Sequence, residues 1–170
     1  MEKEFLNPEN IIEELDLSKR MIVADFGCGS GGWTIPVARK VRWVFALDIQ
    51  EEALSALRSK MRAERIFNID ALLANVEEKT TLLSESCDFV LMTNLLFQVD
   101  DKKKVLEEGK RVLKKGGKIL IIDWIKDNPL TEEVEYVDFE KIKNLAKDMG
   151  LKVEKEFKAG IYHQGLILVK

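Results

Sequence analysis

The 170-residue chain contains few of the residues that build cross-linked or metal-binding proteins. It has two cysteines, Cys28 and Cys87, and one histidine, His163. Two cysteines cannot form a disulfide framework, and with a single histidine they lack the clustered ligands of a zinc site. We therefore expect free thiols, no metal site and a reducing, cytoplasmic location.

Long apolar runs and an excess of positive charge are also absent. No apolar run approaches the roughly 18 residues of a membrane span, and Met1–Phe5 has no signal-peptide character. The net charge is −3, so no overall basic field points to nucleic acid or an anionic membrane. The lysines at 102–104 and 114–118 are explained more simply by a solvated helix face and by charges at a helix carboxyl end. We expect neither a membrane nor a nucleic-acid partner.

The chain does contain enough apolar sequence for a globular core. Hydrophobic residues make up 46% and charged residues 34%, a balance that excludes a disordered protein. There is no internal repeat and no linker rich in proline, glycine or serine. Residues 1–170 are therefore predicted to form a single domain.

Short apolar runs alternate with helical patterns, which is typical of βαβ units around a buried parallel sheet. Gly116-Gly117 and Gly150 are expected to end the last two helices. The predicted helices are Trp33–Lys40, Gln50–Arg62, Asp100 or Asp101 to about Lys114, and Asp138–Met149. The predicted strands are Met21–Phe26, Trp43–Leu47, Arg65–Ile69, Cys87–Thr93 and Lys118–Trp124.

The carboxyl terminus has a different pattern. Leu151–Phe157 and Ile161–Val169 flank a turn at Ala159-Gly160 with no helix between them. Strands joined so closely must be antiparallel. The predicted fold is α/β: a Rossmann-like, seven-stranded, mostly parallel sheet with a C-terminal antiparallel hairpin and helices on both faces.

A glycine-rich segment follows the first predicted strand. Gly27, Gly29, Gly31 and Gly32 let the backbone turn tightly and approach a ligand closely. Asp48 ends the second predicted strand, where a carboxylate can accept both hydroxyl protons of a ribose. Gly27-x-Gly29-x-x-Gly32 also matches the dinucleotide fingerprint, so the glycines alone leave the nucleotide cofactor open.

Three further features help to decide which nucleotide cofactor the glycine segment binds. Asp25 stands at the end of the first strand, where a negative charge suits a ligand with an ammonium group better than one with a pyrophosphate. Asp70 is expected to close the third strand, where it could accept from an adenine amino group. The antiparallel hairpin is the third feature.

These residues resemble a known family. Asp25-x-Gly27-x-Gly29-x-Gly31 is similar to motif I of class I S-adenosylmethionine-dependent methyltransferases, and the likeness covers essentially the whole chain. It resembles most the small-molecule methyltransferases of ubiquinone/menaquinone biosynthesis and the arsenite-methylating kind. The likeness is carried by Val23–Gly29, Ala46–Ile49 and Arg111–Gly117.

The resemblance implies S-adenosylmethionine as the cofactor and gives roles to ten residues. The methionine part would be held by Asp25, Gly27, Gly29, Ser30 and Gly31. The ribose would be bound by Asp48 and the sulfonium end closed by Asn94, while the adenine would meet Ile49, Asp70 and Ala71.

The methyl acceptor is expected outside the carboxyl ends of the strands, where open α/β sheets bind ligands. Its candidate contacts are Phe97, Gln98, Trp124 and Tyr162. Asp123 and His163 are candidate bases, needed only if the acceptor must lose a proton. Each has a simpler reading: Asp123 could only bond a loop backbone, and Trp124 could only pack.

The predicted function is transfer of a methyl group from S-adenosylmethionine to a small-molecule acceptor by in-line displacement. No Asn/Asp-Pro-Pro-aromatic motif follows the fourth strand, which disfavours the usual methylation of adenine or amide nitrogens. A non-catalytic S-adenosylmethionine-binding module acting on a partner protein is one alternative. A nicotinamide oxidoreductase is another, against which Asp25 and the hairpin argue. The acceptor and the oligomeric state stay open.

Overall fold

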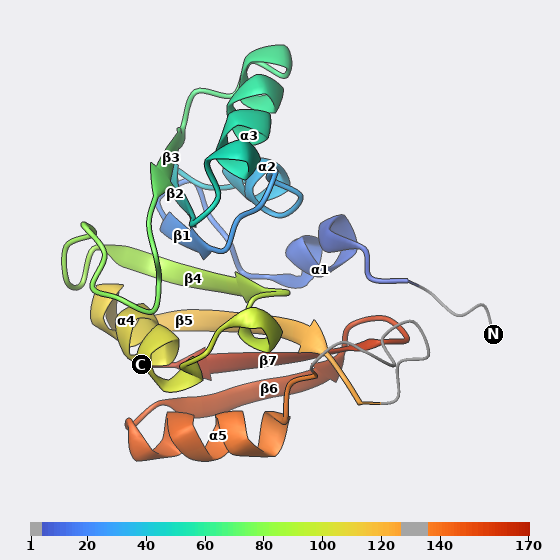
Figure 1. The fold of residues 1–170 in the computed structure, drawn as a ribbon, viewed down its shortest axis with the longest axis vertical. Coiled ribbons are helices and arrows are strands. Elements are labelled where there is room, and N and C mark those ends of the chain that lie inside the picture. Colours follow the sequence, from blue (N-terminus) through green and yellow to red (C-terminus); the bar gives the residue numbers. More distant parts are fainter. Residues whose placement is uncertain (1–4, 127–135) are drawn as a thin grey trace.

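The computed structural model describes residues 5–126 and 136–170, which form one seven-stranded sheet with the order β3-β2-β1-β4-β5-β7-β6 (Figure 1). The helices and the 3-10 turn η1 are α1 (Pro8–Glu14), α2 (Thr34–Ala38), α3 (Glu51–Ala63), η1 (Leu96–Gln98), α4 (Lys102–Val112) and α5 (Phe139–Asp148). The strands are β1 (Ile22–Phe26), β2 (Trp43–Asp48), β3 (Ile69–Leu73), β4 (Cys87–Thr93), β5 (Leu113–Trp124), β6 (Lys152–Lys158) and β7 (His163–Val169).

Six strands run in one direction, and β7 runs opposite to them. β4 is the central strand, and β1 beside it pairs in parallel with β2 and β4. In the C-terminal hairpin, β7 pairs antiparallel with both β5 and β6, with Trp124 opposite His163. The predicted mostly parallel sheet with a terminal hairpin is confirmed.

The helices cover both faces of the sheet, which is also confirmed (Figure 1). α1, α2 and α3 pack on the face that contains Val23, Leu91 and Leu120. α4 and α5 pack on the other face, around residues such as Met92 and Ile119. Strands covered on both faces explain why the predicted runs are apolar at successive positions rather than alternating.

Side-chain caps fix where several helices begin. The Asp101 carboxylate accepts the Lys104 N–H at the start of α4, and the Asp138 carboxylate does the same for Lys141 at the start of α5. Asn7 caps α1, which the sequence reading does not predict. Gly150, with φ +78°, follows the end of α5 as expected.

Two predicted boundaries are wrong. β3 runs from Ile69 to Leu73 rather than from Arg65 to Ile69, and Phe67 is 80% exposed instead of buried in a strand. α4 ends at Val112, so Gly116-Gly117 lies inside β5 and does not stop the helix. There the Gly116 N–H donates to the Lys170 carbonyl, a partner from the far end of the chain that local sequence cannot indicate.

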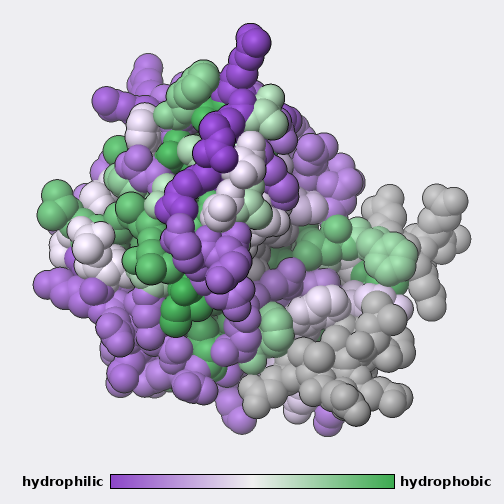
Figure 2. Space-filling model, turned by 45° about the horizontal axis from the view of Figure 1, so that its top comes forward, coloured by the Kyte–Doolittle hydropathy of each residue, from purple (hydrophilic) through white to green (hydrophobic). Residues whose placement is uncertain are grey.

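The molecular surface is largely hydrophilic on the face shown in Figure 2, with hydrophobic patches between the hydrophilic residues. Among residues 5–126 and 136–170, no helix is long and apolar enough to cross a membrane. The same residues contain no cluster of three histidine, cysteine or acidic side chains arranged to hold a metal ion.

Candidate cofactor and acceptor site

A pocket of about 430 Å³ opens at the carboxyl ends of β1, β2 and β4. Its position is that expected for a ligand of an open α/β sheet. Six residues predicted to bind cofactor or acceptor line it: Gly27, Gly29, Asp48, Ile49, Asn94 and Gln98. Residues that the sequence reading does not nominate also line it, among them Trp33, Asn75 and Glu77.

The glycine loop lies against the floor of this pocket in a conformation that side chains resist. Gly27, Gly29 and Gly31 have φ values of +70°, +53° and +90°. A Cβ at Gly27 would lie 2.8 Å from Cδ1 of Leu95, and one at Gly31 would lie 2.5 Å from Cδ1 of Leu57. The turn therefore favours glycine at all three positions, and at Gly27 and Gly31 a side chain would also press against a neighbouring leucine.

Asp48 accepts hydrogen bonds both from the glycine loop and from the residue that precedes α3 at the rim of the pocket. Its Oδ2 accepts the Gly29 N–H at 2.8 Å, and its Oδ1 accepts the Gln50 N–H at 3.0 Å. These contacts hold the carboxylate at the end of β2, half-buried, with lone pairs left for further donors. The neighbouring Ile49 is 66% exposed on the pocket wall, where it offers an apolar surface to a ligand.

Asp25 is fully buried beneath the glycine loop. Its Oδ2 accepts the hydroxyl of Thr34 at 2.6 Å, while Oδ1 has no hydrogen-bond partner among the described residues. Burial raises the pKa of Asp25 to about 7, with the Thr34 hydroxyl opposing the shift and the charge of Asp48 adding to it. An orphaned buried carboxylate oxygen is costly, so this site favours a ligand that brings a donor or a positive charge.

The segment after β3 forms the wall opposite Ile49. Ala74, Asn75, Val76 and Glu77 line the pocket there. The Asn75 Oδ1 accepts the Glu77 N–H at 3.0 Å, and the Glu77 Oε1 accepts the Asp101 N–H at 2.6 Å. These bonds tie the segment to the start of α4.

Asp70 and Ala71 do not lie at this wall. Because β3 begins four residues later than predicted, Asp70 is its second residue and pairs with Phe45 of β2, while Leu73 at the strand's carboxyl end pairs with Asp48. The exposed Asp70 carboxylate accepts the indole N–H of Trp43 at 3.0 Å. The prediction that Asp70 closes the third strand is therefore wrong, and the residues at its carboxyl end are Ala74 and Asn75.

Ser30 and Gly31 flank the pocket without lining it. The exposed Ser30 hydroxyl accepts from the Lys60 Nζ at 3.1 Å, and Gly31 is packed under Leu57. They shape the loop, whereas Gly27 and Gly29 provide its open surface.

Asn94 connects the pocket to the C-terminal hairpin. Its φ is +50°, and its backbone is held by Ile122 and by the Gln98 side chain. The His163 Nε2 lies 2.9 Å from the Asn94 Oδ1, so Nε2 is the protonated nitrogen that donates. Burial lowers the pKa of His163 to about 4, which keeps the ring neutral at pH 7. The ring stacks on Trp124, with centroids 4.0 Å apart.

Asp123 is buried and bonded to backbone on both oxygens. Oδ2 accepts the Leu96 N–H at 2.8 Å and the Phe97 N–H at 3.4 Å, and Oδ1 accepts the Trp124 N–H at 2.9 Å. Burial raises its pKa to about 6, although these hydrogen bonds lower it. The contacts match the simpler reading of Asp123, in which it holds the loop after β4.

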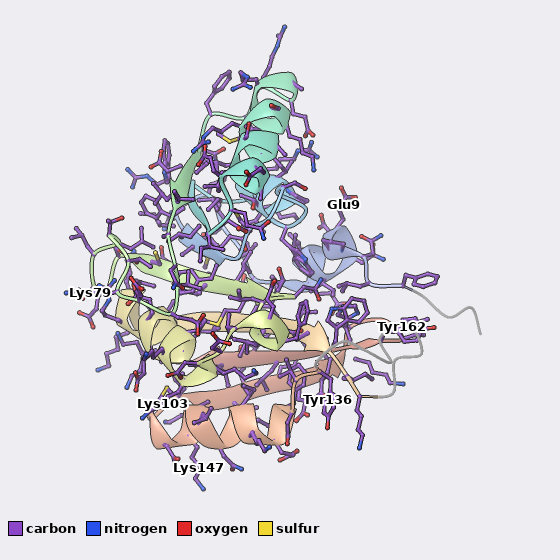
Figure 3. All side chains as sticks on the ribbon, viewed as in Figure 1. Glu9, Lys79, Lys103, Tyr136, Lys147 and Tyr162 are labelled. Carbon is purple, nitrogen blue, oxygen red and sulfur yellow. The ribbon has the colours of Figure 1, made fainter. Side chains whose placement is uncertain are left out.

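The remaining acceptor candidates surround the ends of β4, β5 and β7 but do not line the pocket. Phe97 is half-buried in η1. Tyr162 lies at the tip of the β6–β7 hairpin (Figure 3), with its ring 6.3 Å from that of Phe5. The rings that the structure places beside Asn94 are those of His163 and of Trp124, which packs on it.

A second pocket, of about 500 Å³, lies near the amino ends of β1, β4 and β5. Its rim charges pair with one another, as in Lys114–Asp88 at 2.9 Å and Lys118–Glu154 at 2.8 Å. It has neither the glycine loop nor an orphaned polar group, so the first pocket is the candidate cofactor site.

Comparison with known proteins agrees with this geometry. Residues 24–121, more than half of the chain, match the family model described as "Methyltransferase domain". The chain is 28% identical over 114 residues to a probable cobalt-precorrin-6B C(15)-methyltransferase (decarboxylating) from Methanocaldococcus jannaschii, covering 64% of this chain and 62% of that protein. It is 27% identical to a demethylmenaquinone methyltransferase from Shouchella clausii, covering 88% of this chain and 65% of that protein.

The chain thus spans less than two thirds of the length of these two relatives. A solved structure matches more completely. A SAM-dependent methyltransferase from Aquifex aeolicus superimposes with a TM-score of 0.83 at 28% identity, covering 96% of this chain and 89% of that one. The predicted resemblance to methyltransferases, including the menaquinone kind, is confirmed, and the chain belongs to the methyltransferase domain family.

Proposed function

We propose that this protein transfers the methyl group of S-adenosylmethionine to a small-molecule acceptor. The observation that carries the proposal is the orphaned, buried oxygen of Asp25 beneath a glycine loop that Asp48 holds in place. Two carboxylates beside the loop repel a pyrophosphate but suit a cofactor with an ammonium group and ribose hydroxyls. The relatives that are named after precorrin and demethylmenaquinone support a small acceptor.

The residues present fit S-adenosylmethionine along the whole pocket. Asp25 and the backbone at Gly27 and Gly29 would hold its methionine part, and Asp48 would accept from its ribose. Ile49 gives the adenine an apolar surface to pack on, which explains why its side chain is 66% exposed without a ligand. For the adenine edge we propose the segment Ala74–Glu77 in place of Asp70 and Ala71, because this segment lines the pocket.

S-adenosylmethionine would supply a methyl group on a sulfonium: the acceptor would bond to the methyl carbon as the carbon–sulfur bond breaks, and S-adenosylhomocysteine would leave. The protein's task is then to align the two and to exclude water. Asn94 lines the pocket, and its Oδ1 accepts a hydrogen bond from the His163 ring. The N–H₂ group of the same amide is then left to orient a ligand oxygen. Asp123 acts as a positioning residue, since it holds the N–H groups of Leu96 and Phe97.

This assignment gives His163 the role of a donor to Asn94 rather than that of a base. With Nε2 protonated, only Nδ1 of the neutral ring can take a proton, and a pKa of about 4 makes it a weak base at pH 7. The acceptors that fit best are nucleophiles that need no strong base, such as thiols, amines or activated carbons.

Isothermal titration calorimetry with S-adenosylhomocysteine and with NAD tests the proposal. We expect binding of S-adenosylhomocysteine only, and Asp48→Ala should weaken it about tenfold or more through the lost ribose hydrogen bonds. Glu51→Ala, which removes an exposed carboxylate three residues away, is the matched control and should bind normally. Tight binding of NAD alone would refute the methyltransferase assignment.

The alternative of a non-catalytic binding module predicts the same titration but no product. Transfer of a labelled methyl group to any small molecule separates the two, and a bound but never consumed cofactor would favour the module.

A further inference from the structure

Arginine is concentrated at one edge of the sheet, away from the cofactor pocket. Only seven of the 27 basic residues are arginine, and five of these lie in the last turn of a helix or in the connections that lead into β1, β2 or β3. These strands are adjacent and parallel, so the segments before them meet at a single edge. We call this surface the arginine edge; it comprises Lys19, Arg20, Arg39, Arg42, Trp43, Arg62, Arg65 and Phe67.

Hydrogen bonds between the three segments hold this surface together. The Lys19 ammonium donates to the Arg39 carbonyl, and the Asn68 side chain donates to the Ala38 carbonyl at 2.8 Å. The segments surround a shallow hollow of about 510 Å³, whose lining includes Lys19, Arg39, Trp43, Arg65 and Phe67.

The positive charge of the arginine edge is mostly uncompensated. Arg39 pairs with Glu64 at 2.5 Å. No described residue forms an ion pair with Lys19, Arg20, Arg42, Arg62 or Arg65, all of which are exposed. Five such charges on one edge of a chain with net charge −3 make a local positive field that the overall composition conceals.

Aromatic side chains lie among these charges. Phe67 is 80% exposed, the highest exposure of any large apolar side chain described. Trp43 is half-buried, and its indole N–H is fixed by Asp70. Arginine binds phosphate in a bidentate manner and stacks on planar groups, and exposed aromatic rings stack on unpaired bases.

From this combination we propose that the arginine edge binds single-stranded nucleic acid. An acidic protein segment would use the charges but would have no need of an exposed phenyl ring, and a duplex would hide its bases from Phe67. The expectation of no nucleic-acid partner rests on net charge and on the lysines at 102–104 and 114–118. Neither feature indicates the arginine edge, because its arginines come from three segments that meet only in the folded chain.

Fluorescence anisotropy with a labelled oligouridine of about 12 nucleotides tests the proposal. If about four phosphates are contacted, raising salt from about 50 to 200 mM should weaken binding roughly 50-fold. Phe67→Ala should weaken binding about tenfold with the same salt dependence, because it removes stacking and no charge. Since Phe67 is exposed, this change should leave folding intact.

Paired charge reversals locate the site. The double variant Arg42→Glu, Arg65→Glu should lose most of the binding. The slope of log affinity against log salt concentration should become shallower by about 1.4 or more. Lys147→Glu with Lys152→Glu changes the net charge equally on α5 and β6, at the other end of the sheet (Figures 1 and 3), and should change affinity less than about twofold. Both pairs should keep the affinity for S-adenosylhomocysteine.

Three results would overturn the proposal: equal losses from the two charge-reversal pairs, an unchanged affinity in Phe67→Ala, or binding of a polyglutamate peptide as tight as that of the oligonucleotide. The last result would assign the arginine edge to an acidic protein instead. None of them bears on methyl transfer, so this proposal fails or stands independently of the proposed function.

Discussion

Asp25 illustrates how a single residue can trade stability for binding. Its ordinary pKa of 3.8 is raised to about 7 by burial, so between these values the folded protein holds a proton that the unfolded chain releases. A raised carboxyl pKa means that stability falls as pH rises through this window. Thr34 moderates the penalty because its hydroxyl stabilises the charged form.

We predict that Asp25→Asn stabilises the cofactor-free protein at pH 8, by up to about 4 kcal/mol, and has little effect at pH 4. Urea unfolding at both pH values measures this. The same variant should bind S-adenosylhomocysteine much more weakly, since an amide cannot pair with an ammonium group. A variant that is destabilised equally at both pH values would show that the burial penalty is not the cause.

Cofactor affinity should depend on the same ionisation. Binding an ammonium group requires the Asp25 carboxylate, so affinity should rise with pH up to about 7 and then level off. Thr34→Val removes the hydrogen bond that lowers this pKa and should move the midpoint to higher pH. Calorimetry in buffers of different ionisation enthalpy would detect the proton released below pH 7. A midpoint that is the same in both proteins would contradict this account.

Asp70 and Asn75 provide a direct test of the adenine side. Asp70→Ala should leave the affinity for S-adenosylhomocysteine unchanged, because this carboxylate hydrogen-bonds to Trp43 and does not line the pocket. Asn75→Ala should weaken it about tenfold, the value of one or two hydrogen bonds. The reverse ranking would restore the assignment of Asp70 made from the sequence.

The loop between β3 and β4 is fastened by one buried acid on α4. Glu108, only 6% exposed, accepts from the backbone and hydroxyl of Thr80 at 2.9 and 2.6 Å and pairs with Arg111 at 2.7 Å. Burial opposes ionisation, but the hydrogen bonds from Arg111 and Thr80 outweigh it and lower the pKa of Glu108. The loop that carries Asn75 is thereby anchored to the helix.

Glu108→Ala should therefore cost about 3 kcal/mol, because it leaves the buried Thr80 groups and Arg111 without a partner. Glu107→Ala, on the exposed side of the same helix, removes only a 3.7 Å surface pair and should cost less than about 1 kcal/mol. Chemical denaturation compares the two. Similar losses would show that Glu108 is not the anchor of the loop.

At the same scale, the errors in the predicted elements have a common physical origin. Arg65–Ile69 contains enough apolar residues for a strand, but the exposed Phe67 precedes the sheet edge instead of entering it. Gly116-Gly117 has the composition of a helix stop, yet it lies in β5, where the Gly116 N–H donates to the Lys170 carbonyl. Long-range pairing decided both boundaries, and no local pattern encodes it.

For the whole molecule, most of the architecture follows from local signals. Buried apolar runs, capping aspartates and the short Ala159-Gly160 connection suffice for five parallel strands and a terminal hairpin. The glycine loop and Asp48 are predictable because each lies at a strand end that the apolar pattern marks. The Asn94–His163 bond joins residues 69 positions apart, and the arginine edge joins three separate segments, so only the folded chain reveals them.

The central claim is that the pocket lined by the glycine loop, Asp48 and Asn94, with Asp25 buried beneath that loop, carries out methyl transfer. The most direct test incubates the protein with S-adenosylmethionine labelled on its methyl group and a metabolite extract, and follows label in the small-molecule fraction. We predict transfer by the wild type, its loss in Asp48→Ala and its retention in Glu51→Ala. No transfer by the wild type to any extract component, despite bound cofactor, would contradict the account.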